Sequence, residues 1–471
     1  MPVELLKQIE RHALATPHRA AYVETATGCS MSFRQLVDRF HALRAHTRTA
    51  LNAGDVVLLR CANSVEFAPW LLALLSNGLR VLPVSLELTI SELRSLVARA
   101  SVRAIVADDA SRRALVNHVP TGWSPDCVCD RHTERSDSSP TGELLLASSG
   151  TTGEPKIVRR TSTSLDAVAK NMVDAIGFRQ TDHVLACVPL SHSYGIEHGL
   201  LAPLWAGATV HLCEGMDLPR MATALTTNIT IWPAVPSMIE TLTAVSDAPE
   251  KLPQLRTVYT AGAPLPHNVY ERFHERYRVR VGQLYGMTEI GSVIYSDPSS
   301  PTFNPTSVGQ PMRDVSVRVL DENADGEGEI AIAATSMCSG YVAGELPLVD
   351  GHFRTGDLGR LDAHGNLVIT GRIRLLIESG GVKVNPLEVE TVLATHTGVA
   401  ECVVVPVKQS DTLNRIKAII LPRDFANPPE VNELRQFARE RLAAYKVPRS
   451  FEFVASLPRT AAGKVNRKLL E

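Results

Sequence analysis

The stretch LLLASSGTTGEPKIVRR, residues 144–160, changes abruptly from apolar residues to small and hydroxylated ones. Its apolar part predicts the end of a buried strand. Glycines in the following loop adopt positive φ angles at little cost, so successive N–H groups can point at one anion. Hydroxyl groups and one ammonium group would surround that anion, which predicts a polyphosphate site. Its residues are Ser148, Ser149, Gly150, Thr151, Thr152, Gly153 and Lys156.

Two other interpretations of this stretch deserve comparison. A solvated loop between two strands is the ordinary role of a Gly/Ser/Thr cluster. A Walker A loop requires Gly-x-x-x-x-Gly-Lys-Ser/Thr, whereas Glu154 and Pro155 separate Gly153 from Lys156 here. The stretch therefore disfavours a simple kinase or NTPase.

Length and composition limit the class of protein. The 471 residues exceed what one ordinary core requires, which predicts two or more domains. A net charge of −2, from 48 basic and 50 acidic side chains, favours neither nucleic acid nor an anionic membrane as a partner. No apolar run predicts a membrane span or a secretory signal. With eight scattered cysteines, we expect a cytoplasmic protein with reduced thiols.

The order of apolar segments divides the chain into three parts. Residues 1–110 and the region after the loop alternate strands with helices, which predicts parallel sheets covered on both faces. Short strands separated by Gly and Asp turns at 305–371 predict a small antiparallel barrel or distorted sheet. A compact α+β unit follows, with its clearest helix expected at 430–444.

A second motif, QLYGMTEIG at residues 283–291, also ends a predicted strand. Thr288 and Glu289 would lie at the carboxyl end of that strand, where α/β folds bind ligands. Tyr285 could stack on a base, and Glu289 could provide an oxygen ligand for Mg²⁺. Taken alone, the motif could equally be a turn with a capping threonine and a surface glutamate.

Together the two motifs resemble those of the adenylate-forming superfamily, which includes acyl-CoA and aryl-CoA synthetases, luciferases and nonribosomal peptide synthetase adenylation domains. Ser-Ser-Gly-Thr-Thr-Gly-x-Pro-Lys resembles the family's phosphate loop, and the second motif resembles its Tyr-Gly-x-Thr-Glu. The resemblance implies that Tyr285 contacts adenine, Thr288 the α-phosphate and Glu289 the metal. Six motifs in family order span the chain.

Further segments extend the resemblance to the nucleotide. The loop at Gly262, Ala263 and Pro264 is similar to the family's adenine-side loop. Asp357, in Thr-Gly-Asp, is implied to accept hydrogen bonds from the ribose hydroxyls. Arg372, in Gly-Arg at the domain junction, is implied to contact the ribose or a phosphate.

Three segments relate to the chemical steps. Lys464, in Pro-Arg-Thr-Ala-Ala-Gly-Lys, resembles the family's adenylating lysine, although without context it would be a solvated surface residue. Gly380 and Gly381 resemble the loop that lines the thiol tunnel in the second half-reaction. His192, in Pro-Leu-Ser-His-Ser-Tyr-Gly, resembles a residue beside the acyl pocket; an ordinary hydrogen-bonded imidazole is the alternative.

The chain departs from the family pattern in three places. Ile157 follows Lys156 where many members have glycine, a variant similar to aryl-acid-activating relatives. Arg374 stands where an Asp or Lys is usual, and we expect it to act as a hinge. The chain is also slightly short, with the loss near 110–140.

The resemblance implies an α/β enzyme with two domains. Residues 1–372 would form an N-terminal domain of parallel α/β sheets with a small β-barrel subdomain at 305–371, and residues 373–471 a small mobile α+β domain. ATP and Mg²⁺ would convert a carboxylic acid, an aryl acid among the candidates, to an acyl adenylate, and CoA would take the acyl group. Loading of the phosphopantetheine of a separate carrier protein, luciferase-type oxidation and a non-catalytic nucleotide-binding regulator remain open.

The expected chemistry brings two anions together, so cationic neutralisation is its main requirement. Mg²⁺ on Glu289, Lys156 at the outgoing phosphates and Lys464 between carboxylate and α-phosphate would supply it. Candidates for the acid pocket are residues 194–198, 232–237 and 261–263. Within the first of these segments, Glu197 and His198 could either start a helix or line the pocket. The three segments together contain aromatic, small and polar side chains, a mixture that favours an acid of modest size.

Overall fold

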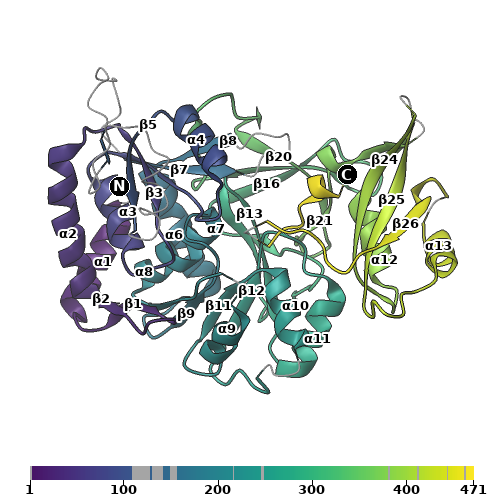
Figure 1. Cartoon of the computed structure of the whole chain (residues 1–471), viewed down its shortest axis with the longest axis horizontal. Coiled ribbons are helices and arrows are strands. Elements are labelled where there is room, and N and C mark those ends of the chain that lie inside the picture. The colour runs from purple at the N-terminus through teal and green to yellow at the C-terminus, as the bar shows by residue number, and fades with distance from the viewer. Residues whose placement is uncertain are drawn as a thin grey trace.

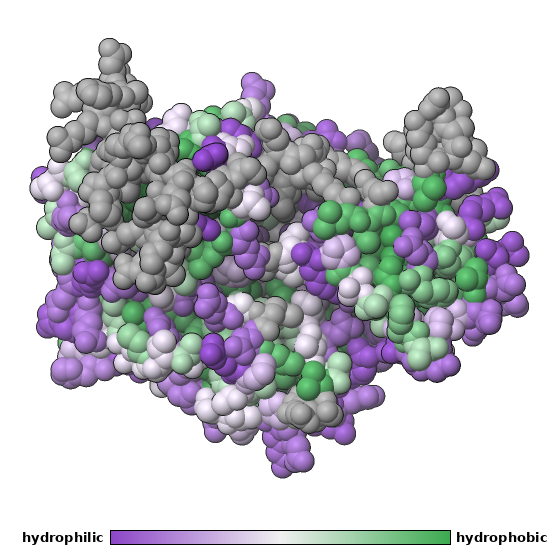
Figure 2. Space-filling view, in the orientation of Figure 1, coloured by the Kyte–Doolittle hydropathy of each residue, from purple (hydrophilic) through white to green (hydrophobic). Residues whose placement is uncertain are grey.

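The computed structural model describes residues 3–108, 128–129, 142–148, 156–215, 217–245, 249–379, 382–410, 413–442, 444–460 and 463–470. The chain up to β21 (Leu367–Arg372) forms the larger part, and the C-terminal unit lies at one side of it, on the right in Figure 1. On the face shown in Figure 2, hydrophilic residues cover much of the rim, while apolar residues gather on the C-terminal unit.

Nine strands form the first sheet of the larger part. Neighbours from β13 to β1 run parallel, and the strands outside them are antiparallel. In spatial order the strands are β15 (Gln310–Pro311), β14 (Gly291–Ser296), β13 (Val281–Met287), β12 (Thr257–Thr260), β11 (Ile231–Ala234), β9 (His183–Ala186), β10 (Thr209–Leu212), β1 (Ala20–Glu24) and β2 (Ser30–Ser32).

Seven strands form the second sheet, which is parallel from β7 to β5. Here β8 returns antiparallel beside β7, because the two strands flank residues 149–155 as a hairpin. In spatial order the strands are β18 (Gly340–Tyr341), β8 (Lys156–Arg160), β7 (Glu143–Ser148), β4 (Arg80–Pro83), β3 (Val56–Arg60), β5 (Val102–Ala107) and β6 (Val128–Cys129).

Helices connect the strands, and one apolar core includes residues of both sheets and of the helices against them. Capping side chains fix several helix starts: the Thr161 hydroxyl accepts from the N–H of Ser164 at the start of α6. The helices are α1 (Val3–Ala15), α2 (Phe33–Ala50), α3 (Phe67–Ser76), α4 (Ile90–Arg99), α6 (Ser162–Ile176), α7 (Ser193–Ile196), the π-helix η1 (Glu197–Leu201), α8 (Ala202–Ala206), α9 (Leu218–Leu225), α10 (Pro236–Ala244) and α11 (His267–Tyr277).

A smaller antiparallel sheet forms the last segment of the larger part, directly before the C-terminal unit in sequence. It packs on its own apolar cluster around Ile330, Ile332 and Phe353. Short antiparallel strands were predicted for residues 305–371, and the structure has them there. Its strands are β16 (Val315–Leu320), β17 (Gly328–Ala334), β19 (Leu348–Val349), β20 (His352–Leu361) and β21.

The C-terminal unit has a separate core, which confirms a compact α+β unit. The short 3₁₀ segment η2 (Ile373–Leu375) leads into it. Pro386 occupies the first turn of α12, as expected. Its elements are β22 (Ile377–Ser379), β23 (Val382–Val384), α12 (Pro386–Ala394), β24 (Val399–Ser410), β25 (Leu413–Pro422), α13 (Val431–Arg439), η3 (Ala444–Lys446), β26 (Ser450–Phe453) and η4 (Arg467–Leu469).

The prediction of a helix over 430–444 was too long. Helix α13 ends at Arg439, because the N–H of Arg441 bonds to the carbonyl of Ala438 three residues back and tightens the last turn. Leu442, beyond the end of the helix, nevertheless packs against the core of the C-terminal unit. Among the described residues, no helix is both long and apolar enough to cross a membrane.

Candidate active site

Asp357 is held between two partners at the junction of the small sheet and the C-terminal unit. It lies opposite Arg372 in the β20–β21 register. Its Oδ1 atom is 2.7 Å from Nε of Arg372, and its Oδ2 accepts a 2.7 Å hydrogen bond from the hydroxyl of Tyr285. Burial raises the pKa of Asp357, while Arg372, Tyr285 and Lys464 lower it. Arg372 and Tyr285, which belong to two other predicted motifs, therefore both bind the carboxylate of Asp357.

We expect Asp357→Asn to raise KM for ATP about 10- to 100-fold, since a hydrogen bond to a charged group contributes about 1.5–3 kcal/mol. Steady-state kinetics with ATP and with 2′-deoxy-ATP measures the effect. If Asp357 binds the ribose, removing the 2′-hydroxyl should cost the wild type more than it costs Asp357→Asn. Equal losses in both proteins would assign Asp357 a structural role in holding Arg372.

Glu289 and Lys156 come together through a residue that the sequence analysis missed. The hydroxyl of Tyr341 donates to Oε1 of Glu289 at 3.1 Å, and Nζ of Lys156 lies 4.4 Å from the centre of the Tyr341 ring. Tyr341 reaches this place because β18 pairs with β8. Its isolated position in the sequence gave no motif that could have identified it.

The structure describes only the two ends of the predicted phosphate loop, Ser148 and Lys156. Ser148 and Lys156 are opposite each other in the β7–β8 register, and the Ser148 hydroxyl donates to the carbonyl of Lys156 at 3.2 Å. The predicted strand end is therefore confirmed. Ser149, Gly150, Thr151, Thr152 and Gly153 lie outside the described residues, as do Gly380 and Gly381.

Lys464 enters the same site from the C-terminal unit. A Cβ atom on Gly262, whose φ is +89°, would lie 3.5 Å from Cε of Lys464, so the lysine stem passes directly over this glycine. Burial and the charge of Arg372 lower the pKa of Lys464, and the charges of Asp357 and Glu289 raise it. The ammonium group thus lies within electrostatic range of both carboxylates.

The neighbouring loops complete this side of the site. Ala263 and Pro264 follow Gly262 between β12 and α11, and Thr288 follows β13, at the strand ends where they were predicted. The carbonyl of Thr288 accepts from Nη1 of Arg160 at 3.3 Å. The roles of these residues toward a nucleotide stay predictions.

His192 combines both interpretations that the sequence left open. Its Nδ1 atom accepts from the N–H of Tyr194 at 3.3 Å, which makes it the N-cap of α7. Burial and the charge of Lys464 lower its pKa to about 4, so the ring is neutral at pH 7. His192 is therefore an ordinary cap that also faces the catalytic lysine candidate.

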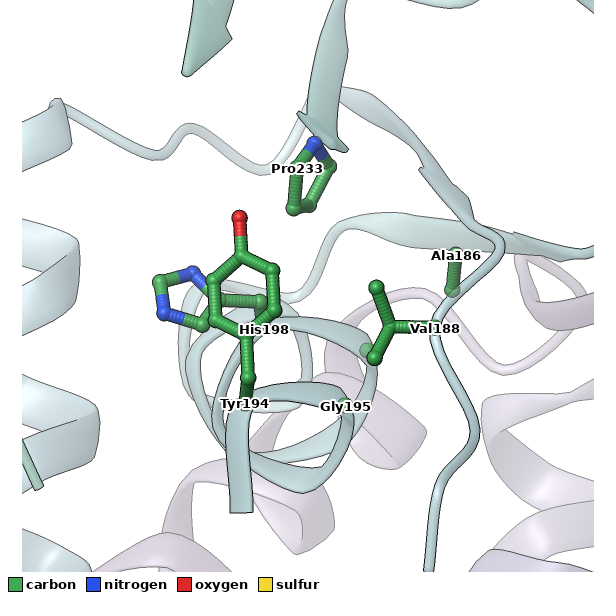
Figure 3. Close-up of a pocket in the computed structure, with 7 residues that line it drawn as sticks. Ala186, Val188, Tyr194, Gly195, His198 and Pro233 are labelled. Carbon is green, nitrogen blue, oxygen red and sulfur yellow. The ribbon is translucent and has the colours of Figure 1, made fainter. Parts of the chain in front are cut away.

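A small cavity opens beside this helix start (Figure 3). Figure 3 shows the rings of Tyr194 and His198 beside each other, with Pro233 and Val188 around them; the ring centres are 4.5 Å apart. Residues from two of the three segments proposed for the acid pocket, 194–198 and 232–237, contribute to its lining, and their role toward an acid stays a prediction. The lining residues are Ala186, Val188, Tyr194, Gly195, His198, Gly199 and Pro233.

A buried chain of polar contacts lies behind the cavity. Nη1 of Arg160 is 3.1 Å from Oε1 of Glu197, and both side chains are almost fully buried. Oε2 of Glu197 accepts a 2.6 Å bond from the hydroxyl of Ser292, and Nε2 of His198 is 3.0 Å from the same hydroxyl. Nδ1 of His198 is 2.7 Å from the hydroxyl of Tyr259. Glu197 is thus a structural partner of Arg160, and His198 lines the cavity.

A cluster of carboxylates and arginines joins the two parts of the chain. The carboxyl group of Glu240, on α10, lies close enough to that of Glu401, on β24, for the two to interact. Glu401 also pairs with Arg459, which donates to the carbonyl of Gly463 at 3.1 Å. Burial and the charge of Glu401 raise the pKa of Glu240 to about 7, against Arg272 and Arg459, which lower it.

Glu240 is connected to Lys464 through Glu401, Arg459 and the carbonyl of Gly463, the residue before the lysine. The ionisation of Glu240 is therefore expected to affect the position of Lys464. A raised pKa means that this contact is fully favourable below pH 4.5 and weakens as the pH rises to about 7. We expect adenylation to fall over this window, and Glu240→Gln, which cannot ionise, to fall less. The side chain of Glu240 is 24% exposed, so screening keeps the difference within about tenfold.

Pyrophosphate-exchange rates at pH 5.5–8 measure this difference. Glu271→Gln is the matched control, because Glu271 lies on α11 beside His267 and is largely exposed. Identical pH profiles for wild type and Glu240→Gln would show that the Glu240–Glu401 contact does not control this step.

Comparisons with known proteins identify the family of this chain. Residues 9–342 match the family described as AMP-binding enzyme, and residues 388–464 match the AMP-binding enzyme C-terminal domain. The oxalate–CoA ligase of Arabidopsis thaliana is 29% identical over 94% of this chain and 94% of its own length. The sulfoacetate–CoA ligase of Cupriavidus necator is 30% identical over 96% and 95%. The solved structure of ATP-bound MatB from Rhodopseudomonas palustris covers 100% of this chain and 98% of its own, with a TM-score of 0.86 and 25% identity.

The fold and the matched regions define an adenylate-forming enzyme with a C-terminal domain. The chain belongs to the AMP-binding enzyme family. The predicted resemblance, the α/β fold class and the class of AMP-forming acid–thiol ligase are thereby confirmed.

Proposed function

We propose that this enzyme activates a small carboxylic acid with ATP and Mg²⁺ and transfers the acyl group to CoA. One observation carries the proposal: Lys464 lies over Gly262 within electrostatic range of Asp357 and Glu289. The side chains that would bind ribose, metal and reacting carboxylate therefore converge in one place. The relatives named as CoA ligases support CoA as the acceptor.

In the proposed first step, the acid carboxylate attacks the α-phosphorus of ATP and pyrophosphate leaves. Lys464 neutralises the approaching anions, which preorganised charge does without reorganisation in the transition state. Asp357 and Tyr285 hold the nucleoside, and Lys156 faces the departing phosphates. Neutral His192 adds no opposing charge to the acid site.

Glu289 fits the proposed role of metal ligand. Its Oε1 accepts a 3.1 Å hydrogen bond from the hydroxyl of Tyr341, which fixes the orientation of the carboxylate. Magnesium is commonly held by one or two carboxylates together with substrate phosphates and water. Within the described residues, no group of three His, Cys, Asp or Glu side chains is placed to hold a metal ion. When bound, Mg²⁺ would neutralise phosphate charge.

The second half-reaction requires Lys464 to withdraw so that a thiol can reach the adenylate carbonyl. We infer that residues 1–372 and 373–471 act as two domains, with Arg374 in η2 as the pivot between them. A change of φ/ψ at a few junction residues is sufficient for such a rotation. Six cysteines of the described part of the chain are free thiols, which supports a cytoplasmic enzyme; they are Cys29, Cys61, Cys187, Cys213, Cys338 and Cys402.

Loading of a separate carrier protein is the second candidate. It shares the first step, so only the acceptor distinguishes it. Purified enzyme should release pyrophosphate and AMP from ATP with an acid and a thiol. Comparing kcat/KM for CoA with that for a phosphopantetheinyl carrier would decide the acceptor. Formation of ADP and phosphate would contradict the proposed function.

A further inference from the structure

The cavity beside His192 presents no charged side chain among the residues that line it. Apart from Tyr194 and His198, its lining consists of glycine, alanine, valine and proline. The volume open to the centre of a water-sized sphere is about 10 Å³, which is room for one small group. Its lining includes Tyr194, two residues after His192, and Pro233, two residues before Val235. A Cβ atom on Gly463, the residue before Lys464, would lie 3.1 Å from Val235, so the cavity is near the place where Lys464 enters the site.

The two polar side chains in the lining are already satisfied by protein groups. The Tyr194 hydroxyl donates to the carbonyl of Ala234 at 3.1 Å. Because the Ser292 hydroxyl donates to Glu197, it must accept from His198 Nε2–H, and His198 Nδ1 then accepts from Tyr259. Each ring therefore gives the cavity its apolar surface and keeps its hydrogen-bonding atoms for the protein.

The buried cation Arg160 does not line the cavity. Its Nη1 is paired with Glu197, and its Nη2, which has no hydrogen-bond partner among the described residues, lies beside Gly291. Lys464 is needed for the carboxylate that reacts. A second anion in the cavity would lose its water without gaining a partner, which is strongly unfavourable. Because the cavity offers no partner to a second negative charge, it discriminates against acids that carry one.

We propose that the enzyme selects monocarboxylic acids whose remaining group is uncharged and apolar, and rejects dianionic acids. This inference rests on the proposed function and names its substrate class. It separates this chain from relatives named for oxalate and sulfoacetate, which are dianions. The wall residues Val188 and Pro233 and the occupied rings of Tyr194 and His198 determine the selection.

Matched acids test the inference on the wild-type enzyme. Propionate and malonate differ by one methyl in place of a carboxylate, as do 4-methylbenzoate and terephthalate. We expect kcat/KM in pyrophosphate exchange to favour the apolar member of the better pair at least about 100-fold. Equal or greater activity with the dianion would overturn the inference alone. No exchange with any acid, aliphatic or aryl, would overturn the proposed function as well.

A gain of charge gives a second test. Val188→Lys would place an ammonium group at the cavity wall, and Val188→Met is a control of similar length without charge. The ratio of malonate to propionate activity should rise at least tenfold in Val188→Lys relative to Val188→Met. Because both variants enlarge the same side chain, comparing ratios separates charge from packing. An unchanged ratio would show that the cavity does not contact the distal group of the acid.

Discussion

Lys464→Ala is expected to lower the rate of adenylation about 10²–10³-fold, equivalent to about 3–4 kcal/mol of transition-state stabilisation. The reason is geometric: the lysine stem crosses Gly262 and brings the only C-terminal ammonium group described in the site toward Asp357 and Glu289. Thioester formation from a synthetic acyl adenylate should change little, because Lys464 must leave for that step. Pyrophosphate exchange and thiolysis measure the two steps separately.

A surface lysine provides the control. Lys417, also in the C-terminal unit, pairs with Glu452 at 2.9 Å on an exposed face. Lys417→Ala should leave both half-reactions within about twofold, since exposed pairs contribute little. If Lys464→Ala slowed both half-reactions equally, Lys464 would be a structural residue.

Glu197→Gln is expected to destabilise the N-terminal part of the chain by about 3–5 kcal/mol, because Arg160 would remain buried with its charge uncompensated. Nη2 of Arg160 already has no hydrogen-bond partner among the described residues, and the partners that the guanidinium would keep, the Thr288 carbonyl and the Ser164 hydroxyl, carry no charge. Urea unfolding followed by tryptophan fluorescence measures the effect, since the four tryptophans lie at or before residue 232.

Two further variants make this result specific. Asp174→Asn removes the partner of Arg313 on the surface and should cost at most about 1 kcal/mol. Adding Arg160→Met to Glu197→Gln should restore part of the lost stability, because the unpaired charge is removed. A double variant no more stable than Glu197→Gln would show that packing, and not charge, explains the loss.

Much of this site could be predicted because its residues stand in contiguous motifs at strand ends. Asp357, Arg372 and Tyr285 were found in that way, and the structure brings them to one point. Tyr341 could not be found, since its place depends on the pairing of β18 with a strand 180 residues earlier in the chain, as shown by the bond of Ser339 to Arg159. Local pattern carries no information on such a long-range contact.

The same limit explains the interior of the acid pocket. Glu197 and His198 are adjacent in the sequence, and both could have been pocket residues. The direction of each side chain depends on the π-helical turn η1 and on Ser292 and Tyr259, which come from other strands. Alternation and spacing do not show which of two polar neighbours faces a cavity and which faces a buried arginine.

The occupied hydrogen bonds of the pocket rings also make substrate choice insensitive to acidity. Burial lowers the pKa of His198 to about 3 and raises that of Tyr194 and Tyr259 well above their usual range. None of the three changes charge between about pH 4 and pH 9. Rising pH can therefore slow the enzyme through Glu240 while the relative rates for two competing acids stay constant. Turnover thus depends on an ionisation at Glu240, whereas discrimination depends on side chains that keep one charge state over this pH range.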